Sequence, residues 1–174
     1  MQKDYDFMIK CKPIRSGKQT AAMIITFALL ALLTGILATY GLSMGIPLIV
    51  GRLSFGVVLS VALYYMIKYT LADIEYELSA DTLSIIKIVG RKRTVMGALD
   101  LKMSVDLVDK DEFKKNKEKY GKIARNFNYR QNPFGGGAVY VFTFSDQTYS
   151  IDFEPNEPFI KLLKEAIERN KTEE

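Results

Sequence analysis

The pattern of hydrophobic and polar positions divides the chain into two parts of different character. Between residues 19 and 67 the only charged side chain is Arg52, and two apolar runs, about 20–40 and about 47–67, fill most of this stretch. At about 1.5 Å per residue the first run forms a helix about 30 Å long, which matches the apolar core of a bilayer. It also lacks the polar stripe that a helix at the surface of a soluble protein carries. We therefore predict two transmembrane helices, joined by the short linker 41–45 into an antiparallel hairpin.

The second run is less regular, because Arg52 lies inside it. An Arg near the centre of a span costs about 2.5–3.5 kcal/mol, but near an end its side chain can reach the headgroups. We therefore place Arg52 in the first two turns, with Pro47 at the helix start, where a missing N–H costs nothing. Tyr64, Tyr65 and Tyr69 then form an aromatic belt at the opposite interface.

Basic residues flank the two runs unevenly. Five precede the first run and Lys68 follows the second, whereas the connecting turn has only Arg52 nearby. The positive-inside rule therefore predicts that both termini are cytoplasmic, in a multi-pass protein of the cell membrane. A cleaved signal peptide is the alternative, and it fits poorly because the first run exceeds an h-region and a second run follows. The predicted membrane-interface residues are Arg15, Lys18, Arg52, Tyr64, Tyr65, Lys68 and Tyr69.

After residue 68 the pattern changes to short alternating segments, which indicate strands. A charged stretch, 109–122, interrupts them as a loop or short helix, and residues 156–169 carry an amphipathic stripe at helical spacing behind the N-cap candidate Asn156. Six or seven antiparallel strands and one helix in roughly 100 residues predict a mainly-β small barrel or sandwich, capped by the C-terminal helix. The predicted strands cover 74–78, 83–88, a segment starting at 94, 101–108, 123–129, 138–144 and 148–153.

The net charge of +4 follows this division. Residues 1–18 hold five basic and two acidic residues, Arg52 adds one charge, and residues 68–174 hold 18 of each sign. The excess is therefore a signal of membrane topology, and it does not indicate nucleic-acid binding by the domain. The predicted parts are a cytoplasmic basic N-terminal tail (1–19), two transmembrane helices (20–68), a cytoplasmic domain (69–170) and a polar tail (171–174).

Short motifs in the predicted domain carry a resemblance to a known family. They are the run Tyr76 to Leu83, which reads YELSADTL, followed by Ile85 and by Gly90 to Arg93, and the helix after Phe153 to Asn156. This order resembles the pleckstrin-homology-like (PH-like) domains of bacterial membrane proteins, over roughly residues 70–169 and apart from 109–137. The resemblance implies a PH-like fold behind two N-terminal transmembrane helices. Eukaryotic relatives bind lipid headgroups through basic residues on an early hairpin, so the implied candidates are Lys87, Arg91, Lys92 and Arg93.

Much catalytic chemistry is excluded by composition. The chain has no His, which removes His-dependent nucleophilic sites and most zinc sites. The single cysteine, Cys11, cannot form an intramolecular disulfide; we expect it in the polar tail, with palmitoylation near the membrane as the alternative. The glycines 135–137 lead into a strand and lack the Lys of a phosphate-binding loop, so a flexible connection is expected there. We predict no catalytic residues, no metal and no cofactor.

We therefore expect a non-catalytic membrane protein that presents its PH-like domain for protein–protein interaction or self-assembly, as a scaffold. The expected partner is a second copy or another membrane or cytoplasmic protein, and no nucleic acid. The alternative is a sensor of anionic lipid headgroups that uses the basic hairpin turn, since each Lys or Arg near an anionic leaflet gains about 1 kcal/mol. An enzyme of unknown type comes third.

Overall fold

The computed structural model describes residues 8–40, 45, 47–132 and 136–172. Most of the predicted linker 41–45, the tail residue Lys3, Gly135 and the last two residues lie outside the described residues. The chain forms two compact units, residues 15–72 and a domain made of residues 1–14 and 73–174. Each unit is described by itself.

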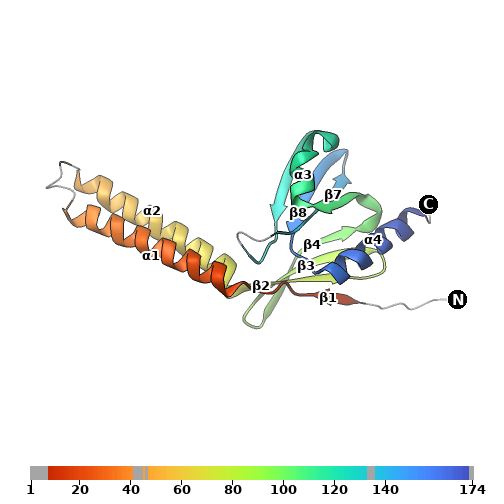
Figure 1. Cartoon of the computed structure of the whole chain (residues 1–174), viewed down its shortest axis with the longest axis horizontal. Helices are drawn as coiled ribbons and strands as arrows, with labels where there is room; N and C mark the ends of the chain where they lie inside the picture. The colour runs from red at the N-terminus through yellow and green to blue at the C-terminus, as the bar shows by residue number, and fades with distance from the viewer. Residues whose placement is uncertain (1–7, 41–44, 46, 133–135, 173–174) are drawn as a thin grey trace. The chain divides into compact units, whose positions relative to one another are not determined.

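The first unit is a pair of helices, α1 (Gly17–Tyr40) and α2 (Leu48–Met66), which lie side by side (Figure 1). A π-helical turn, η2 (Ile67–Leu71), extends α2. Both helices are long and apolar enough to cross a membrane, and most of their large apolar side chains are exposed. The two predicted helices are confirmed, with Pro47 immediately before α2 and Arg52 at its fifth residue.

Close packing joins the two helices where Gly51 meets α1. A Cβ atom on Gly51 would lie 2.7 Å from the carbonyl oxygen of Leu37 and 2.8 Å from the Cα of Ala38, so only glycine fits this contact. The polar side chains of α1 turn back on their own helix, as in the hydrogen bond that the Thr26 hydroxyl donates to the Ala22 carbonyl at 2.9 Å. The hydroxyls of Thr26, Thr34 and Thr39 are thus paired with backbone carbonyls of their own helix, as an apolar surrounding requires.

The first sheet of the domain, sheet A, has four strands in the order β1 (Ile9–Cys11), β2 (Ala72–Leu78), β3 (Thr82–Val89) and β4 (Lys92–Asp100). β1 corrects the prediction of an N-terminal tail, because residues 9–11 pair antiparallel with residues 76–78. Cys11 lies in the core with 3% exposure, which removes both the tail placement and palmitoylation. The sequence did not predict this strand, because an alternation with only two apolar positions, Ile9 and Cys11, is too short to identify one.

The second sheet, sheet B, has the order β5 (Ser104–Asp109), β7 (Ala138–Phe144), β8 (Gln147–Phe153) and β6 (Ile123–Asn128). The expectation of an all-antiparallel fold is wrong for β6, which pairs parallel with β8. β8 lies between β6 and β7 and is antiparallel to β7, so β6 and β7 run in opposite directions. The predicted strand 101–108 begins as a 3₁₀ turn, η3 (Leu101–Met103). The charged stretch forms α3 (Lys110–Lys115) and η4 (Lys117–Tyr120).

The two sheets stay separate and form a sandwich, which decides between the two predicted architectures. The predicted C-terminal helix is confirmed as α4 (Glu157–Thr172), and its first turn is capped by Asn156, whose side-chain oxygen accepts a hydrogen bond from the Phe159 N–H at 2.9 Å. Phe159 and Leu163 of α4 are buried with Tyr76 and Phe153, whose rings meet edge to face at 5.3 Å. A smaller core lies under α3 and η4.

Candidate functional site

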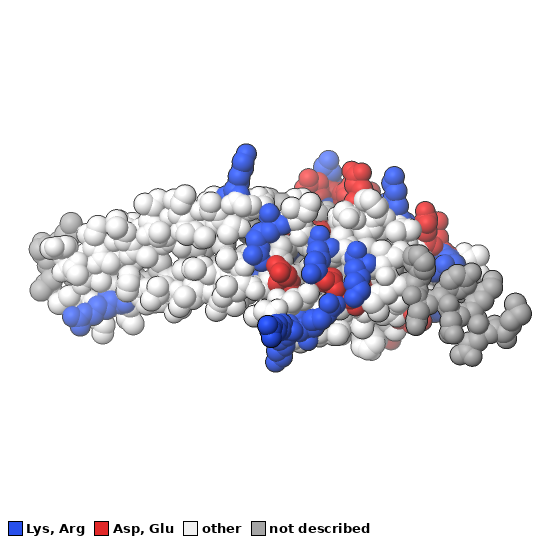
Figure 2. Space-filling model, turned by 90° about the horizontal axis from the view of Figure 1, so that it is seen from below, with Lys and Arg blue, Asp and Glu red and all other residues white. Residues whose placement is uncertain are grey.

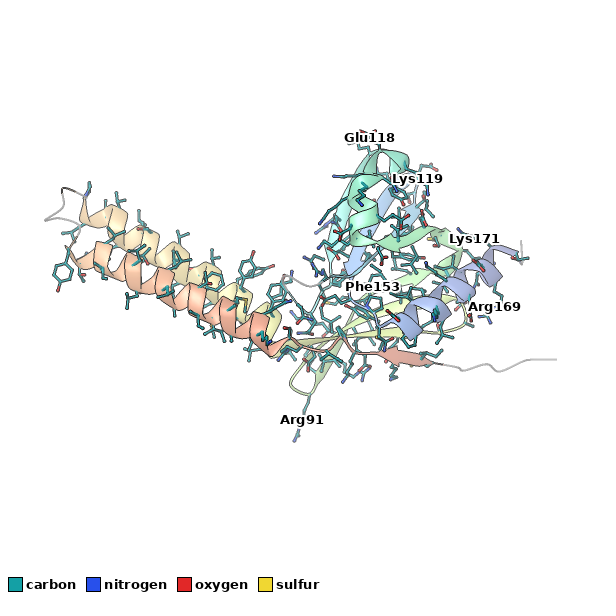
Figure 3. All side chains as sticks on the ribbon, in the orientation of Figure 1. Arg91, Glu118, Lys119, Phe153, Arg169 and Lys171 are labelled. Atoms are coloured by element: carbon teal, nitrogen blue, oxygen red, sulfur yellow. The ribbon has the colours of Figure 1, made fainter. Side chains whose placement is uncertain are left out.

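The β3–β4 hairpin carries the basic residues that the resemblance singled out. Its two-residue turn, Gly90 and Arg91, closes between Val89 and Lys92, which face each other across the hairpin. Gly90 has a φ of +59°, a left-handed conformation that glycine adopts without strain. Arg91 and Lys92 are exposed, and Arg91 points away from the domain (Figure 3). The turn therefore presents two cations to solvent.

The same hairpin exposes apolar side chains beside these cations. Val89, Val95 and Met96 have exposed fractions of 44%, 63% and 44%. Residues 87–97 contain four basic residues and no acidic one. A surface of this composition suits an anionic bilayer, where cations are attracted to the headgroups and apolar side chains enter the interfacial layer.

The turn lies at a defined end of sheet A. Residues 79–81 connect β2 to β3 as a tight turn, in which the Ser79 N–H donates to the Thr82 carbonyl, so the two strands are antiparallel. β3 therefore ends where β2 begins, and β1 also ends there because it is antiparallel to β2. The chain leaves the domain after Ile14 and re-enters it at Asp73. Both connections to the helical unit and the basic turn thus share one end of sheet A.

Arg93 is engaged by two carboxylates of β2. Its Nη2 atom lies 2.6 Å from Glu75 Oε1 and 2.7 Å from Glu77 Oε1. Lys10 Nζ lies 2.8 Å from Glu77 Oε1, and Lys12 Nζ lies 3.2 Å from Glu75 Oε2. We call these five residues the outer carboxylate cluster. The Glu75 and Glu77 side chains are only 4% and 10% exposed, whereas the three cations are about half exposed.

The cluster favours the charged form of the Glu75 carboxyl. Burial alone would raise the pKa of the Glu75 carboxyl, but hydrogen bonds from Arg93 and Lys12 lower it, and the pKa lies below its usual value. Figure 2 shows the same chemistry at the surface, where Lys and Arg side chains gather around a few acidic ones over this part of the domain. The cluster therefore has a surplus of positive charge at its surface.

Sequence reasoning identified one of the five cluster residues, Arg93. The alternation that predicted the strand 74–78 also puts Glu75 and Glu77 on one face and Tyr76 on the other, but it does not indicate which cations lie beside these carboxylates. Lys87, the remaining predicted candidate, is half buried opposite Thr94. The four predicted cations thus divide into an exposed pair, one engaged arginine and one half-buried lysine.

The predicted membrane-interface residues lie at the ends of the helical unit. Arg15 donates from Nη2 to the Ala72 carbonyl at 3.1 Å, and Lys18 and Arg52 are exposed. Tyr65 contacts both Tyr64 and Tyr69, with ring centroids 5.5 Å and 5.8 Å away. Tyr69 is only 5% exposed, so it packs within the unit, with the Lys68 ammonium 5.0 Å from its ring centre.

A second group of carboxylates, the inner carboxylate cluster, is enclosed where β5, β6 and β8 of sheet B end. Arg130, 4% exposed, lies 3.5 Å from Asp152 and 3.3 Å from Glu154, and Lys110 Nζ lies 2.9 Å from Asp152. Glu154 also accepts hydrogen bonds from the backbone N–H groups of residues 131 and 132, at 3.1 Å and 2.8 Å. These contacts fix the chain that leads from β6 toward β7.

Gly137, directly before β7, packs closely against the backbone of β8. A Cβ atom there would lie 2.6 Å from the Phe153 carbonyl oxygen, whereas one on Gly136 would meet nothing within 4 Å. The expectation of a merely flexible glycine connection is therefore wrong at Gly137, which the close approach of β8 requires to be glycine.

Among the described residues, no group of three or more Cys, Asp or Glu side chains is placed to hold a metal ion. The chain belongs to the bacterial PH-like domain family (DUF6106), whose sequence model matches residues 13–173. The match includes both helices of the first unit and the sandwich apart from β1. No curated protein matches the chain.

Proposed function

We propose that this bacterial PH-like domain protein crosses the cell membrane twice, keeps both termini in the cytoplasm, and uses its β3–β4 hairpin to hold the domain against anionic lipid headgroups of the same bilayer. The role is non-catalytic. One observation carries the proposal: the turn end of the hairpin, residues 87–97, has exposed cations and apolar residues and no acidic residue, and it lies at the end of sheet A from which the chain runs to the two helices.

The pairing of β1 with β2 supports the proposed topology. β1 precedes α1 and β2 follows α2, and the two strands share one sheet. Strands can pair only on the same side of a membrane, so the intervening chain makes an even number of crossings. Two apolar helices satisfy this condition, and the four basic residues before α1, with Lys18 in its first turn, favour the cytoplasmic side.

The expected lipid contact is weak by itself and sufficient for a tethered domain. Arg91 and Lys92 contribute about 1 kcal/mol each near an anionic leaflet, and exposed Val95 and Met96 add an apolar contribution. The two spans keep the domain at the bilayer, so the contact acts at a high effective concentration. Its consequence is a fixed orientation of the domain, since targeting is already achieved by the spans.

The test is a reporter on the hairpin of the full chain in nanodiscs. An environment-sensitive dye at Met96→Cys is compared in phosphatidylcholine alone and with increasing phosphatidylglycerol. Cys11 is buried and is not expected to react with the dye. We expect the emission to shift to the blue, and lipid-borne quenchers to act on the dye, only when phosphatidylglycerol is present. The control is the same dye at Glu118→Cys, far from Arg91 in Figure 3.

Charge reversal makes the test specific. The pair Arg91→Glu and Lys92→Glu is expected to abolish the response at residue 96. The matched control, Lys115→Glu and Lys117→Glu on α3 and η4, changes the net charge equally at exposed positions and is expected to leave the response intact. Equal responses in both pairs, or equal responses of dyes at residues 96 and 118, would overturn the proposal.

A second candidate function is interaction with another protein, including self-assembly. It rests on β4, an edge strand of sheet A with exposed Val95 and Met96. A β-bulge near Met96 and the basic pair at its start oppose pairing with a further strand, which is why this function ranks second. Crosslinking of the full chain in native membranes tests it, and a protein found only as an unpartnered monomer contradicts it.

A further inference from the structure

We propose that Arg93 is an exchangeable cation: it binds Glu75 and Glu77 when no anion is present and moves to an anionic headgroup when the hairpin meets the bilayer, while Lys10 and Lys12 of the N-terminal segment keep the two carboxylates neutralised. This inference rests on the proposed function and concerns the regulation of that same site.

The count of charges in the outer carboxylate cluster makes the exchange feasible. Two buried carboxylates are matched by three cations, and each carboxylate has a lysine of its own, Lys10 on Glu77 at 2.8 Å and Lys12 on Glu75 at 3.2 Å. Removing the only partner of a buried carboxylate is strongly unfavourable. Removing Arg93 leaves one lysine on each carboxylate, so the third cation can leave without exposing an unpaired buried charge.

The three cations differ in where their backbones are fixed. Lys10 and Lys12 lie in and directly after β1, which pairs with β2 opposite the carboxylates, with Lys10 facing Glu77 in the register. Arg93 reaches the same carboxylates from β4, two strands away. It follows Arg91 and Lys92 directly in the hairpin, and its side chain is 47% exposed. Arg93 is therefore the cation of the cluster that is continuous with the lipid-contacting turn.

The exchange makes the N-terminal segment a regulator of the hairpin. When β1 is paired with β2, Lys10 and Lys12 form ion pairs with Glu77 and Glu75, and Arg93 is available to bind lipid. Without the two lysines, Arg93 becomes the cation that must remain on Glu75 and Glu77, and the hairpin contacts lipid with two exposed cations. Affinity of the hairpin for anionic lipid then depends on residues about 80 positions earlier in the chain.

A four-variant cycle tests the exchange with the dye at residue 96 of the full chain in nanodiscs of phosphatidylcholine and phosphatidylglycerol. The variants are the parent, Arg93→Gln, Lys10→Gln with Lys12→Gln, and all three changes together. We expect Arg93→Gln to weaken the contact about fivefold in the parent and to have almost no effect when both lysines are absent. The same fivefold loss in both backgrounds is what simple addition of surface charge gives, and it would overturn the exchange.

A second background tests the exchange without changing the lysines, because the lysine variants could differ from the parent only by losing the pairing of β1 with β2. Glu75→Gln with Glu77→Gln keeps the shape of both side chains and all three cations. We expect this variant to bind phosphatidylglycerol-containing nanodiscs more tightly, because Arg93 is released, and to keep the full fivefold effect of Arg93→Gln. Unchanged or weaker binding would overturn the exchange. Hydrogen exchange at the amides of residues 76–78 reports whether β1 stays paired.

The outcomes separate the exchange from the function on which it rests. A parent protein whose dye never responds to phosphatidylglycerol overturns the proposed function and the exchange together. A parent that responds, but whose Arg93→Gln effect is the same in every background, overturns the exchange alone.

Discussion

The two carboxylate clusters of the domain use similar residues and differ in enclosure. In the outer cluster, Glu75 and Glu77 are buried, whereas the side chains of their three cations are 47–59% exposed to solvent. In the inner cluster, Arg130 is itself 4% exposed, and Glu154 is also bound by two backbone N–H groups. The inner cluster therefore buries its arginine, Arg130, and the arginine of the outer cluster, Arg93, is half exposed.

This difference teaches how the same ion pair serves two purposes. An enclosed arginine cannot leave, because its charge and those of its partners would be buried without compensation. Its contribution is to fix a chain segment, here residues 129–132 beside β8. A half-exposed arginine whose carboxylates are also paired with other cations adds little stability and remains available for other anions. Burial of the cation therefore distinguishes a structural ion pair from an exchangeable one.

The strongest test of the comparison is Arg130→Leu. It leaves Glu154 and Asp152 with one fewer cation in an enclosed site, and we expect the free energy of unfolding to fall by about 3–5 kcal/mol. Urea unfolding of the full chain in detergent, followed by the near-ultraviolet circular dichroism of its tyrosines, measures the loss. Arg130→Lys, which keeps the charge, is expected to lose less. A loss below about 1 kcal/mol, as for a surface pair, would break the comparison.

Gly137→Ala tests whether the segment held by the inner cluster is tightly packed. The added Cβ meets the Phe153 carbonyl oxygen at 2.6 Å, and both are backbone-fixed, so we expect a loss of about 1–3 kcal/mol in the same assay. The matched control is Gly136→Ala, where the Cβ meets nothing within 4 Å. Equal stability of the two variants would mean that the segment can shift, and that the inner cluster does not fix it.

Acid titration examines the outer cluster through the lowered pKa of Glu75. A carboxyl whose pKa is lower in the folded state stabilises the fold above its unfolded pKa of about 4.5 and loses that contribution as the pH falls through the folded value. We therefore expect stability to decline below about pH 4.5, with part of the decline absent in Glu75→Gln. Parallel pH profiles of the parent and Glu75→Gln would contradict the assignment.

The smallest expected effect is that of Arg93→Gln on stability. Arg93 is half exposed and is the third cation on two carboxylates, so its pairing is screened by solvent and duplicated by lysines. We expect a loss of less than about 1 kcal/mol, together with a clear loss of lipid contact. A stability loss as large as that of Arg130→Leu would show that the two arginines play the same role, and the comparison would fail.

Patterns that extend over many residues were sufficient to predict most helices and strands of the fold. The two apolar runs, the alternating strands and the stripe of Phe159 and Leu163 each repeat over enough residues to identify the element. The resemblance to PH-like domains added the arrangement of these elements, which local patterns do not contain. The family match confirms the resemblance.

Three features depended on long-range contacts that no local pattern encodes. β1 has only three residues and gains its place from β2, about 65 residues later. The parallel direction of β6 follows from where its neighbour β8 lies in the sheet. The outer carboxylate cluster unites β1, β2 and β4, so Arg93 looked like a free cation until its partners across the sheet were known.

The placement of the two helices between β1 and β2 has a consequence for how the protein is made. Ile9 to Cys11 are synthesised before both helices, and their partners, residues 76–78, follow only after the 64 residues 12–75. Sheet A therefore gains its last edge strand only after α1 and α2 have been synthesised. In the proposed topology, a chain that left Ile9 to Cys11 on the other side of the membrane from residues 76–78 would lack β1 in sheet A, and the core around Cys11 would stay incomplete.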